Sequence, residues 1–232
     1  MTEQNKYPFA FKPTIKGSTI KDSAEYFPVG KVYCVGRNYS DHAREMGGNI
    51  DAKQPFFFSK PPQSITQLKS ITFPKNTENL QHEVELVVLL KSGGLDIVQA
   101  EASKHIFGYA VGVDLTKRDL QSLAKEQGKP WDLSKGFDNS APISKITKKE
   151  NYLLDEGSIC LNVNGQSRQS SNISNMVWKV DELISWLSKF ITLKAGDIIF
   201  TGTPAGVGRL VPNDKIDAEI ENVGRLSFEL TK

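Results

Sequence analysis

The chain has 232 residues, 38% of them hydrophobic and 24% charged, as is typical of a globular protein with one large domain or two small ones. Its 29 basic and 27 acidic residues give a net charge of +2, a balance that argues against binding to nucleic acid or to a membrane surface. No apolar run approaches the roughly 18 residues of a membrane span, the first residues lack the apolar core of a secretory signal, and two cysteines are too few for a disulfide framework. We therefore expect a cytosolic protein.

The first half of the chain predicts strands with one short helix between them. An apolar run at 31–36 predicts a strand ending in a turn, and 38–48 predicts a short helix that a glycine pair ends. Residues 55–60 predict a second strand, closed by two prolines. The apolar runs at 80–90 and 107–114 predict two further buried strands.

The next segments continue this pattern. A helix capped by Thr116, with Asp119 at its third position, is expected to end near Gly128. Alternating apolar residues at 159–163 run into Asn164-Gly165, a strong signal for a type I′ β-hairpin.

The last part of the chain predicts one helix and three strands. Asp181 is expected to cap a helix over 183–191, and a strand follows at 198–200. Alternation at 216–220 and 226–230 predicts two C-terminal strands. Because strands dominate and helices are short, we expect an α+β fold on a sheet-rich core. No repeat or linker divides the chain, so we expect a single domain over 1–232, with 1–28 as an N-terminal extension.

Two carboxylates stand two residues apart at the start of a predicted buried strand. Glu83 and Glu85 would point to the same face, because side chains alternate along a strand. Asp114 ends another predicted strand and can bring a third carboxylate to the same point. Such a cluster is costly to bury without a cation, and oxygen ligands favour Mg²⁺, Mn²⁺ or Ca²⁺. The alternative is that these acids are solvated strand ends or salt-bridge partners.

Two pairs of residues at helical spacing are candidate functional groups. His42 and Glu45 stand three apart, so the carboxylate can orient the imidazole and make it a general base, or the two can form a surface ion pair. Arg118 and Gln121 also stand three apart, and the arginine can hold a substrate carboxylate or lie on an exposed helix face.

The glycine-rich segment at 201–208 lacks the endings of a P-loop and of a dinucleotide fingerprint. A turn that brings Thr203 against a ligand is the better interpretation. No nucleophile-elbow pattern occurs, and neither cysteine stands beside a histidine, so a serine or cysteine hydrolase is a weak alternative.

Six segments, in order, resemble the fumarylacetoacetate hydrolase family, in particular its short acylpyruvase-like and oxaloacetate decarboxylase-like branch. They are VGRNYSDHAREMG (35–47), PFFFSKPPQSI (55–65), HEVEL (82–86), GYAVGVDLTKRDLQ (108–121), GKPWDLSKGFDNSAPI (128–143) and LKAGDIIFTGTPAGVG (193–208).

The resemblance implies a role for each candidate residue. The implied metal ligands are Glu83, Glu85 and Asp114; the implied catalytic residues are His42, Glu45 and Lys135; and the implied substrate contacts are Arg118, Gln121, Lys135 and Thr203. It also implies a mixed β-roll fold, Mg²⁺ or Mn²⁺ as cofactor, a 2-oxo acid substrate and a homodimer.

The activity implied by the resemblance is metal-dependent hydrolysis of a C–C bond in acylpyruvate-type 2,4-dioxo acids, through a metal-stabilised pyruvate enolate. Oxaloacetate decarboxylation and tautomerisation of a 2-oxo diacid are alternatives, because both use the same enolate. A metal-binding protein without catalysis is a more remote alternative, since binding alone needs no general base.

Overall fold

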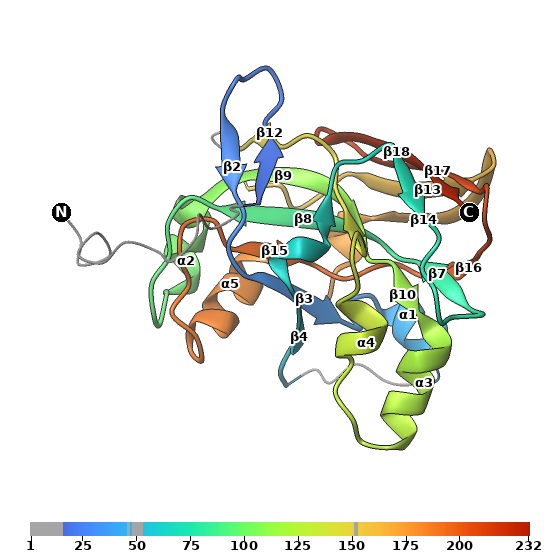
Figure 1. Cartoon of the computed structure of the whole chain (residues 1–232). Coiled ribbons are helices and arrows are strands. Elements are labelled where there is room, and N and C mark those ends of the chain that lie inside the picture. The colour runs from blue at the N-terminus through green and yellow to red at the C-terminus, as the bar shows by residue number, and fades with distance from the viewer. Residues whose placement is uncertain (1–15, 46, 48–52, 151–152) are drawn as a thin grey trace, which may run out of the picture.

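A mixed six-stranded sheet forms the centre of the molecule, in a computed structural model that describes residues 16–45, 47, 53–150 and 153–232 (Figure 1). Its strands, in spatial order, are β12 (Thr147–Lys148), β9 (Ile106–Val113), β8 (Val84–Leu90), β15 (Ile198–Phe200), β3 (Val32–Gly36) and β4 (Phe56–Lys60). Only the β15–β3 pair in this sheet is parallel.

A second, five-stranded sheet packs against one face of the first. It contains, in spatial order, β14 (Gln166–Asn172), β13 (Ser158–Val163), β17 (Lys215–Ile220), β18 (Gly224–Thr231) and β6 (Ser70–Thr72). The predicted hairpin is confirmed: Asn164 and Gly165 join β13 to β14 with φ values of 52° and 74°, as a type I′ turn requires.

Strand β8 is buried on both faces, which explains its continuous apolar sequence. Leu86 and Val88 belong to the core between the two sheets, together with Leu161 of β13. Val87 and Leu89 face a second core on the other side.

The remaining strands form three small sheets. They are β1 (Gly17–Thr19) with β2 (Tyr26–Pro28); β10 (Thr116–Lys117), β7 (Leu80–His82) and β16 (Gly208–Leu210); and β11 (Ala141–Pro142) with β5 (Ile65–Thr66). Phe27 of β2 is buried in the second core, so the described part of the N-terminal segment packs on the domain.

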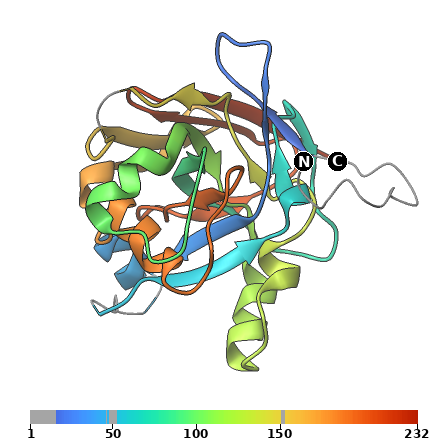
Figure 2. The same cartoon turned by 90° about the vertical axis from the view of Figure 1, so that its left-hand side faces the viewer.

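Within the described residues, five short α-helices lie around the sheets, and the strand-rich composition confirms the predicted α+β class. They are α1 (Ser40–Glu45), α2 (Gln99–Ala102), α3 (Arg118–Glu126), α4 (Asp132–Lys135) and α5 (Val180–Ser188). Both views show α3 and α4 projecting from one end of the sheets (Figures 1 and 2). None of the described helices is long and apolar enough to cross a membrane.

Two predicted helix caps are wrong. Thr116 lies in β10 and its hydroxyl donates to the carbonyl of Asp114, so α3 begins only at Arg118. Helix α5 begins at Val180, and its first turn is closed by Glu182, which accepts the backbone N–H of the preceding Lys179. In both cases a tertiary or neighbouring contact replaced the expected local cap.

Candidate active site

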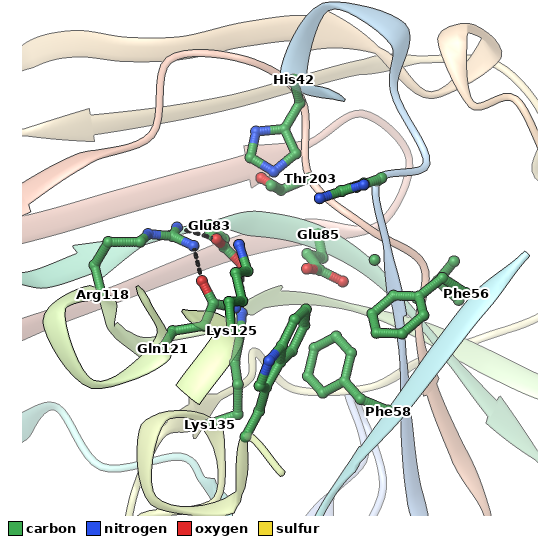
Figure 3. A pocket seen from close by; sticks show the side chains of 14 residues that line it. His42, Phe56, Phe58, Glu83, Glu85, Arg118, Gln121, Lys125, Lys135 and Thr203 are labelled. Carbon is green, nitrogen blue, oxygen red and sulfur yellow. Dashed lines mark hydrogen bonds and ion pairs between the residues drawn. The ribbon is translucent and has the colours of Figure 1, made fainter. Parts of the chain in front are cut away.

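A cavity opens where β3 ends and β8 begins (Figure 3). Its lining includes seven of the predicted site residues: His42, Glu83, Glu85, Arg118, Gln121, Lys135 and Thr203. The other two, Glu45 and Asp114, contact lining residues from behind. The structure therefore brings together all nine residues that the sequence singled out, from segments that are far apart along the chain.

The pairing of β8 with β9 places the three acidic residues side by side. Val84 lies opposite Val113, and the backbone N–H of Asp114 donates to the carbonyl of Glu83 over 2.8 Å. Carboxylate oxygens of Glu83, Glu85 and Asp114 all lie within 4.8 Å of one another, and all three residues are buried. Asp114 thus reaches its partners because the strand register, rather than local spacing, positions it.

Three buried cations surround these acids. The ammonium of Lys135 lies 2.7 Å from an oxygen of Glu83 and 2.7 Å from an oxygen of Asp114. Lys60 lies 2.8 Å from the other oxygen of Asp114, and Arg118 pairs with the other oxygen of Glu83. Three negative and three positive side chains cancel formally, so a bound divalent cation would make the cluster positive and suited to an anionic ligand.

The charges in the cluster shift the pKa of its members in opposite directions. Burial alone would raise the pKa of Glu83, but Lys135 and Arg118 outweigh it and hold that pKa well below its usual range. Asp114 and Glu83 likewise keep the pKa of Lys135 above its usual value despite burial. Burial, followed by the charges of Asp114 and Glu83, raises the pKa of Glu85 well above normal. Ionised Glu85 is therefore the acid that most needs another cation.

The donor set fits a hard divalent cation such as Mg²⁺ or Mn²⁺. It consists of carboxylate oxygens, and within the described residues no histidine or cysteine joins the group. Oδ1 of Asp114 is buried and lies 2.8 Å from the Lys60 ammonium, yet outside hydrogen-bonding geometry, so it retains the capacity to bind an ion. Glu85 is held by the backbone N–H of Gly202 at 2.7 Å.

Hydrogen bonds within the protein leave two of the predicted substrate contacts, Gln121 and Thr203, with donor groups for a ligand. Nη1 of Arg118 donates to Oε1 of Gln121 over 2.6 Å, which leaves the amide N–H groups of Gln121 as donors to a ligand. The hydroxyl of Thr203 accepts a 2.8 Å hydrogen bond from Gln169, so its own proton is available to donate. Both groups therefore suit the oxygens of a carboxylate or a carbonyl.

His42 and Glu45 lie on α1, at the edge of the cavity. Nδ1 of His42 lies 3.2 Å from a carboxylate oxygen of Glu45, which leaves Nε2 as the free nitrogen of the imidazole. The backbone N–H of Gly206 donates to both oxygens of Glu45, at 3.1 and 3.2 Å. His42 is only 6% exposed, so this pair is part of the cavity wall rather than a surface ion pair.

Lys60 was missed by the sequence reasoning. Besides Asp114, its ammonium contacts the carbonyls of Leu115, Lys135 and Ser140 and the hydroxyl of Ser140. The only local signal is a lysine at the end of the apolar run 56–60, and lysine in that place is normally solvated.

Gln169 was also missed, because it lies in the polar sequence of β14. It is 1% exposed, and its amide oxygen accepts from the backbone N–H of Val84 and contacts Nδ1 of His82, both at 3.0 Å. Its amide nitrogen donates to Thr203 and to the carbonyl of Pro204. His82 thus contacts Gln169 and is not a member of the carboxylate cluster.

Comparison with known proteins identifies close relatives. A fumarylpyruvate hydrolase from Ralstonia sp is 38% identical over 186 residues, covering 79% of this chain and 97% of the relative. The oxaloacetate tautomerase YcgM of Escherichia coli is 40% identical over 193 residues, covering 82% of this chain and 88% of the relative. The crystal structure of fumarylpyruvate hydrolase from Pseudomonas aeruginosa with Mn²⁺ and pyruvate superposes with a TM-score of 0.93 at 40% identity, over 97% of this chain and 99% of that one.

A family model, that of the fumarylacetoacetate hydrolase C-terminal domain, matches residues 31–231. The match begins at β3 and runs through β18, so it includes every strand of the two large sheets and every residue of the cavity described above. On this match, and on relatives that align with most of its length, the chain belongs to the fumarylacetoacetate hydrolase family.

Proposed function

We propose that this protein is a divalent-metal-dependent hydrolase that cleaves a C–C bond in acylpyruvate-type 2,4-dioxo acids and releases pyruvate. The observation that carries the proposal is that an oriented histidine lines the same cavity as Glu83 and Glu85, two acids of the three-carboxylate cluster. A cluster of acids alone would suit metal binding, but the imidazole beside it adds a general base for water. The relatives named fumarylpyruvate hydrolase support this choice of substrate class.

Glu83, Glu85 and Asp114 would hold the metal ion in this proposal. The bound ion supplies Lewis-acid stabilisation of the negative charge that develops on the 2-oxo oxygen when the neighbouring C–C bond breaks. The amide of Gln121 and the hydroxyl of Thr203 would donate hydrogen bonds to the oxygens of the pyruvate half and fix its orientation.

Water activation is assigned to His42. Its free Nε2 takes a proton from water while Glu45 stabilises the resulting imidazolium, and the hydroxide adds to the 4-carbonyl carbon. The bond between C3 and C4 then breaks, its electron pair forms the pyruvate enolate, and the acyl group leaves as a carboxylic acid. Protonation of the enolate at C3 gives pyruvate. Lys135 contributes positive charge beside the developing enolate, and Arg118 holds Gln121 and Glu83 in place.

Tautomerisation of oxaloacetate is the second candidate, and the relative named oxaloacetate tautomerase favours it. That reaction moves a proton at C3 and needs no attacking water. Oxaloacetate decarboxylation would pass through the same enolate, and it also needs no water.

A substrate panel separates these activities. Purified protein with Mg²⁺ or Mn²⁺ is assayed for acylpyruvate hydrolysis, for oxaloacetate tautomerisation and for decarboxylation, alongside the variants His42→Ala and Glu45→Gln. We expect acylpyruvate hydrolysis that both variants impair. Hydrolysis that survives loss of His42 would contradict the water-activation role, and oxaloacetate chemistry without acylpyruvate cleavage would reverse the ranking. Metal binding without turnover of any 2-oxo acid would favour a non-catalytic role.

Three further properties are part of the proposal. We infer a homodimer, a cytoplasmic location and Mg²⁺ as the usual ion, in line with the family resemblance and the oxygen-only donor set. Light scattering of the purified protein tests the oligomeric state, and metal analysis of protein purified without added ions tests the preference for Mg²⁺.

A further inference from the structure

We propose that Arg37 recognises a second carboxylate at the far end of the substrate, so that the preferred acylpyruvates are dianions whose acyl group ends in a carboxylate. This inference rests on the proposed function and deepens it. It assigns a specificity role to a residue outside the metal cluster and outside the His42–Glu45 pair.

The backbone of Arg37 adopts a conformation that disfavours an ordinary side chain. Its φ is 58°, in the left-handed region, where a residue with a Cβ is strained. The next residue holds this geometry, because the buried side chain of Asn38 donates to the carbonyls of Trp178 and Thr201 and accepts the backbone N–H of Trp178. The chain thus maintains a strained arginine at the mouth of the cavity, where a glycine would fit without strain.

Arg37 has an uncompensated charge. Among the residues that the structure describes, it forms no ion pair or hydrogen bond, although it lines the cavity that contains the carboxylate cluster. Two other cations of that cavity, Lys135 and Arg118, are each paired with Glu83, and a third, Lys125, lies over the ring of Trp131. Arg37 is exposed, so its guanidinium is free to meet an incoming anion.

A wider groove lies beside this cavity, and none of the described residues that line it is acidic. The two cavities share Arg37, Phe56, Lys125 and Trp131 in their walls. The rings of Phe56 and Trp131 pack edge to face with centroids 5.2 Å apart, and the ammonium of Lys125 lies 5.3 Å from the Trp131 ring. The junction therefore combines flat apolar walls with two positive charges.

The pKa of Lys125 is consistent with an excess of positive charge at this junction. Burial, and then the nearby charges of Arg118 and Arg37, lower its pKa below the usual value. An anion placed between Arg37 and Lys125 would relieve this repulsion. A substrate whose 2-oxo end lies at Glu83 and Glu85 can extend its acyl group toward this junction, because Glu83, Glu85, Arg37 and Lys125 all line the first cavity.

Binding of two inert ligands tests the inference without catalysis. Titration calorimetry in Mg²⁺ compares 2-oxoadipate with 2-oxohexanoate, which have the same length and the same 2-oxo acid end but differ in the terminal carboxylate. We expect the wild type to bind 2-oxoadipate about tenfold more tightly, as one charge-assisted hydrogen-bonded pair allows. Arg37→Gly should abolish most of this difference and leave 2-oxohexanoate binding unchanged.

The variants are chosen so that misfolding does not imitate the expected result. Arg37→Gly relieves the strained φ and should fold at least as well as the wild type. Arg225→Ala removes an exposed arginine from β18, outside the cavities that Arg37 lines, and should keep the full preference for 2-oxoadipate. Equal binding of both ligands by the wild type, or an undiminished preference in Arg37→Gly, would overturn the proposal.

Kinetics separate this inference from the proposed function. We expect Arg37→Gly to lower kcat/KM for fumarylpyruvate about tenfold and to leave that for acetylpyruvate within about twofold. Equal losses on both substrates would refute charge recognition while hydrolysis itself still stands. A binding preference for 2-oxoadipate in a protein that hydrolyses no acylpyruvate would refute the proposed function and support the role of Arg37.

Discussion

Replacing Lys60 with methionine should destabilise the protein more than any surface charge change. Methionine has nearly the same length but no charge, so the substitution removes an ammonium without opening a large cavity. Lys60 and Asp114 have fully buried side chains, and their charged atoms lie 2.8 Å apart. Loss of Lys60 leaves that carboxylate short of one of its two cations.

The expected cost follows from these contacts. Breaking a buried ion pair by removing one partner costs about 3–5 kcal/mol. Lys135 still contacts the other oxygen of Asp114 at 2.7 Å, which favours the lower end of that range. The carbonyls of Leu115 and Ser140 lose a donor as well, which adds about 1 kcal/mol. We therefore expect a loss of about 4 kcal/mol in the free energy of unfolding without added metal, a large part of a typical total of about 5–15 kcal/mol.

Urea unfolding in a metal chelator measures this loss. The matched control is Lys104→Met, since Lys104 pairs on the surface with Glu101 and should cost less than about 1 kcal/mol. Saturating Mg²⁺ should stabilise Lys60→Met more than the wild type, because the ion then supplies the positive charge that Asp114 lacks.

A double-mutant cycle decides whether the charge pair is the cause. With Asp114→Asn in the background, the cost of Lys60→Met should fall by about 1–3 kcal/mol. A loss below about 1 kcal/mol in Lys60→Met, or strictly additive effects in the cycle, would refute the reasoning.

Three other predictions follow from the geometry. His42→Ala and Glu45→Gln should each reduce kcat for acylpyruvate hydrolysis, by about 10²–10⁴-fold for His42, and should affect oxaloacetate tautomerisation much less, because that reaction uses no attacking water. Gly206→Ala should have a free energy of unfolding about 1–3 kcal/mol lower than that of Gly165→Ala. Both glycines have positive φ, but a Cβ at Gly206 would lie 2.1 Å from a backbone carbonyl oxygen of β14, whereas a Cβ at Gly165 would meet open space. Tyr33→Phe should be tolerated at pH 7, because the buried hydroxyl has no hydrogen-bond partner within the described residues. The same variant should lose less stability than the wild type above pH 10, since burial and the charge of Asp197 raise the pKa of Tyr33 to about 12.

The sign of the Tyr33 prediction follows from which state ionises first. Above pH 10 the tyrosine of the unfolded chain loses its proton while that of the folded chain keeps it. This ionisation lowers the free energy of the unfolded state, so the stability of the fold decreases until about pH 12. Identical pH profiles for the wild type and Tyr33→Phe would contradict this prediction. The hydrolysis prediction fails if His42→Ala leaves kcat unchanged, and the glycine prediction fails if the two alanine variants unfold alike.

Local spacing predicted some parts of the site and not others. The His42–Glu45 contact needs only helical spacing, and Glu83 and Glu85 stand two residues apart in extended chain at the start of β8, so the sequence sufficed. Asp114 was a weaker inference because its position depends on the register between β8 and β9.

The missed residues depend on contacts that no short segment contains. Lys60 is buried because the loop at 135–140 folds over the end of β4, 75 to 80 residues further along the chain. Gln169 is buried because the 203–204 turn closes against β14. Arg37 was not singled out, since its left-handed backbone depends on the contacts of Asn38 with Trp178 and Thr201. The strands were easier to predict because the alternation of apolar residues is itself local.

The position of β15 has a consequence for synthesis of the chain. Residues 198–200 pair with β8 on one side and β3 on the other, and so close the centre of the six-stranded sheet. A nascent chain that has not yet reached this segment exposes one edge of β8, a strand that is buried along its whole length in the folded protein, and such an edge is an open template for aggregation. The sheet therefore depends on pairing between segments that are distant in the chain, which predicts slow folding that is completed only late in translation. Until the last strands emerge, the chain is expected to need protection by chaperones.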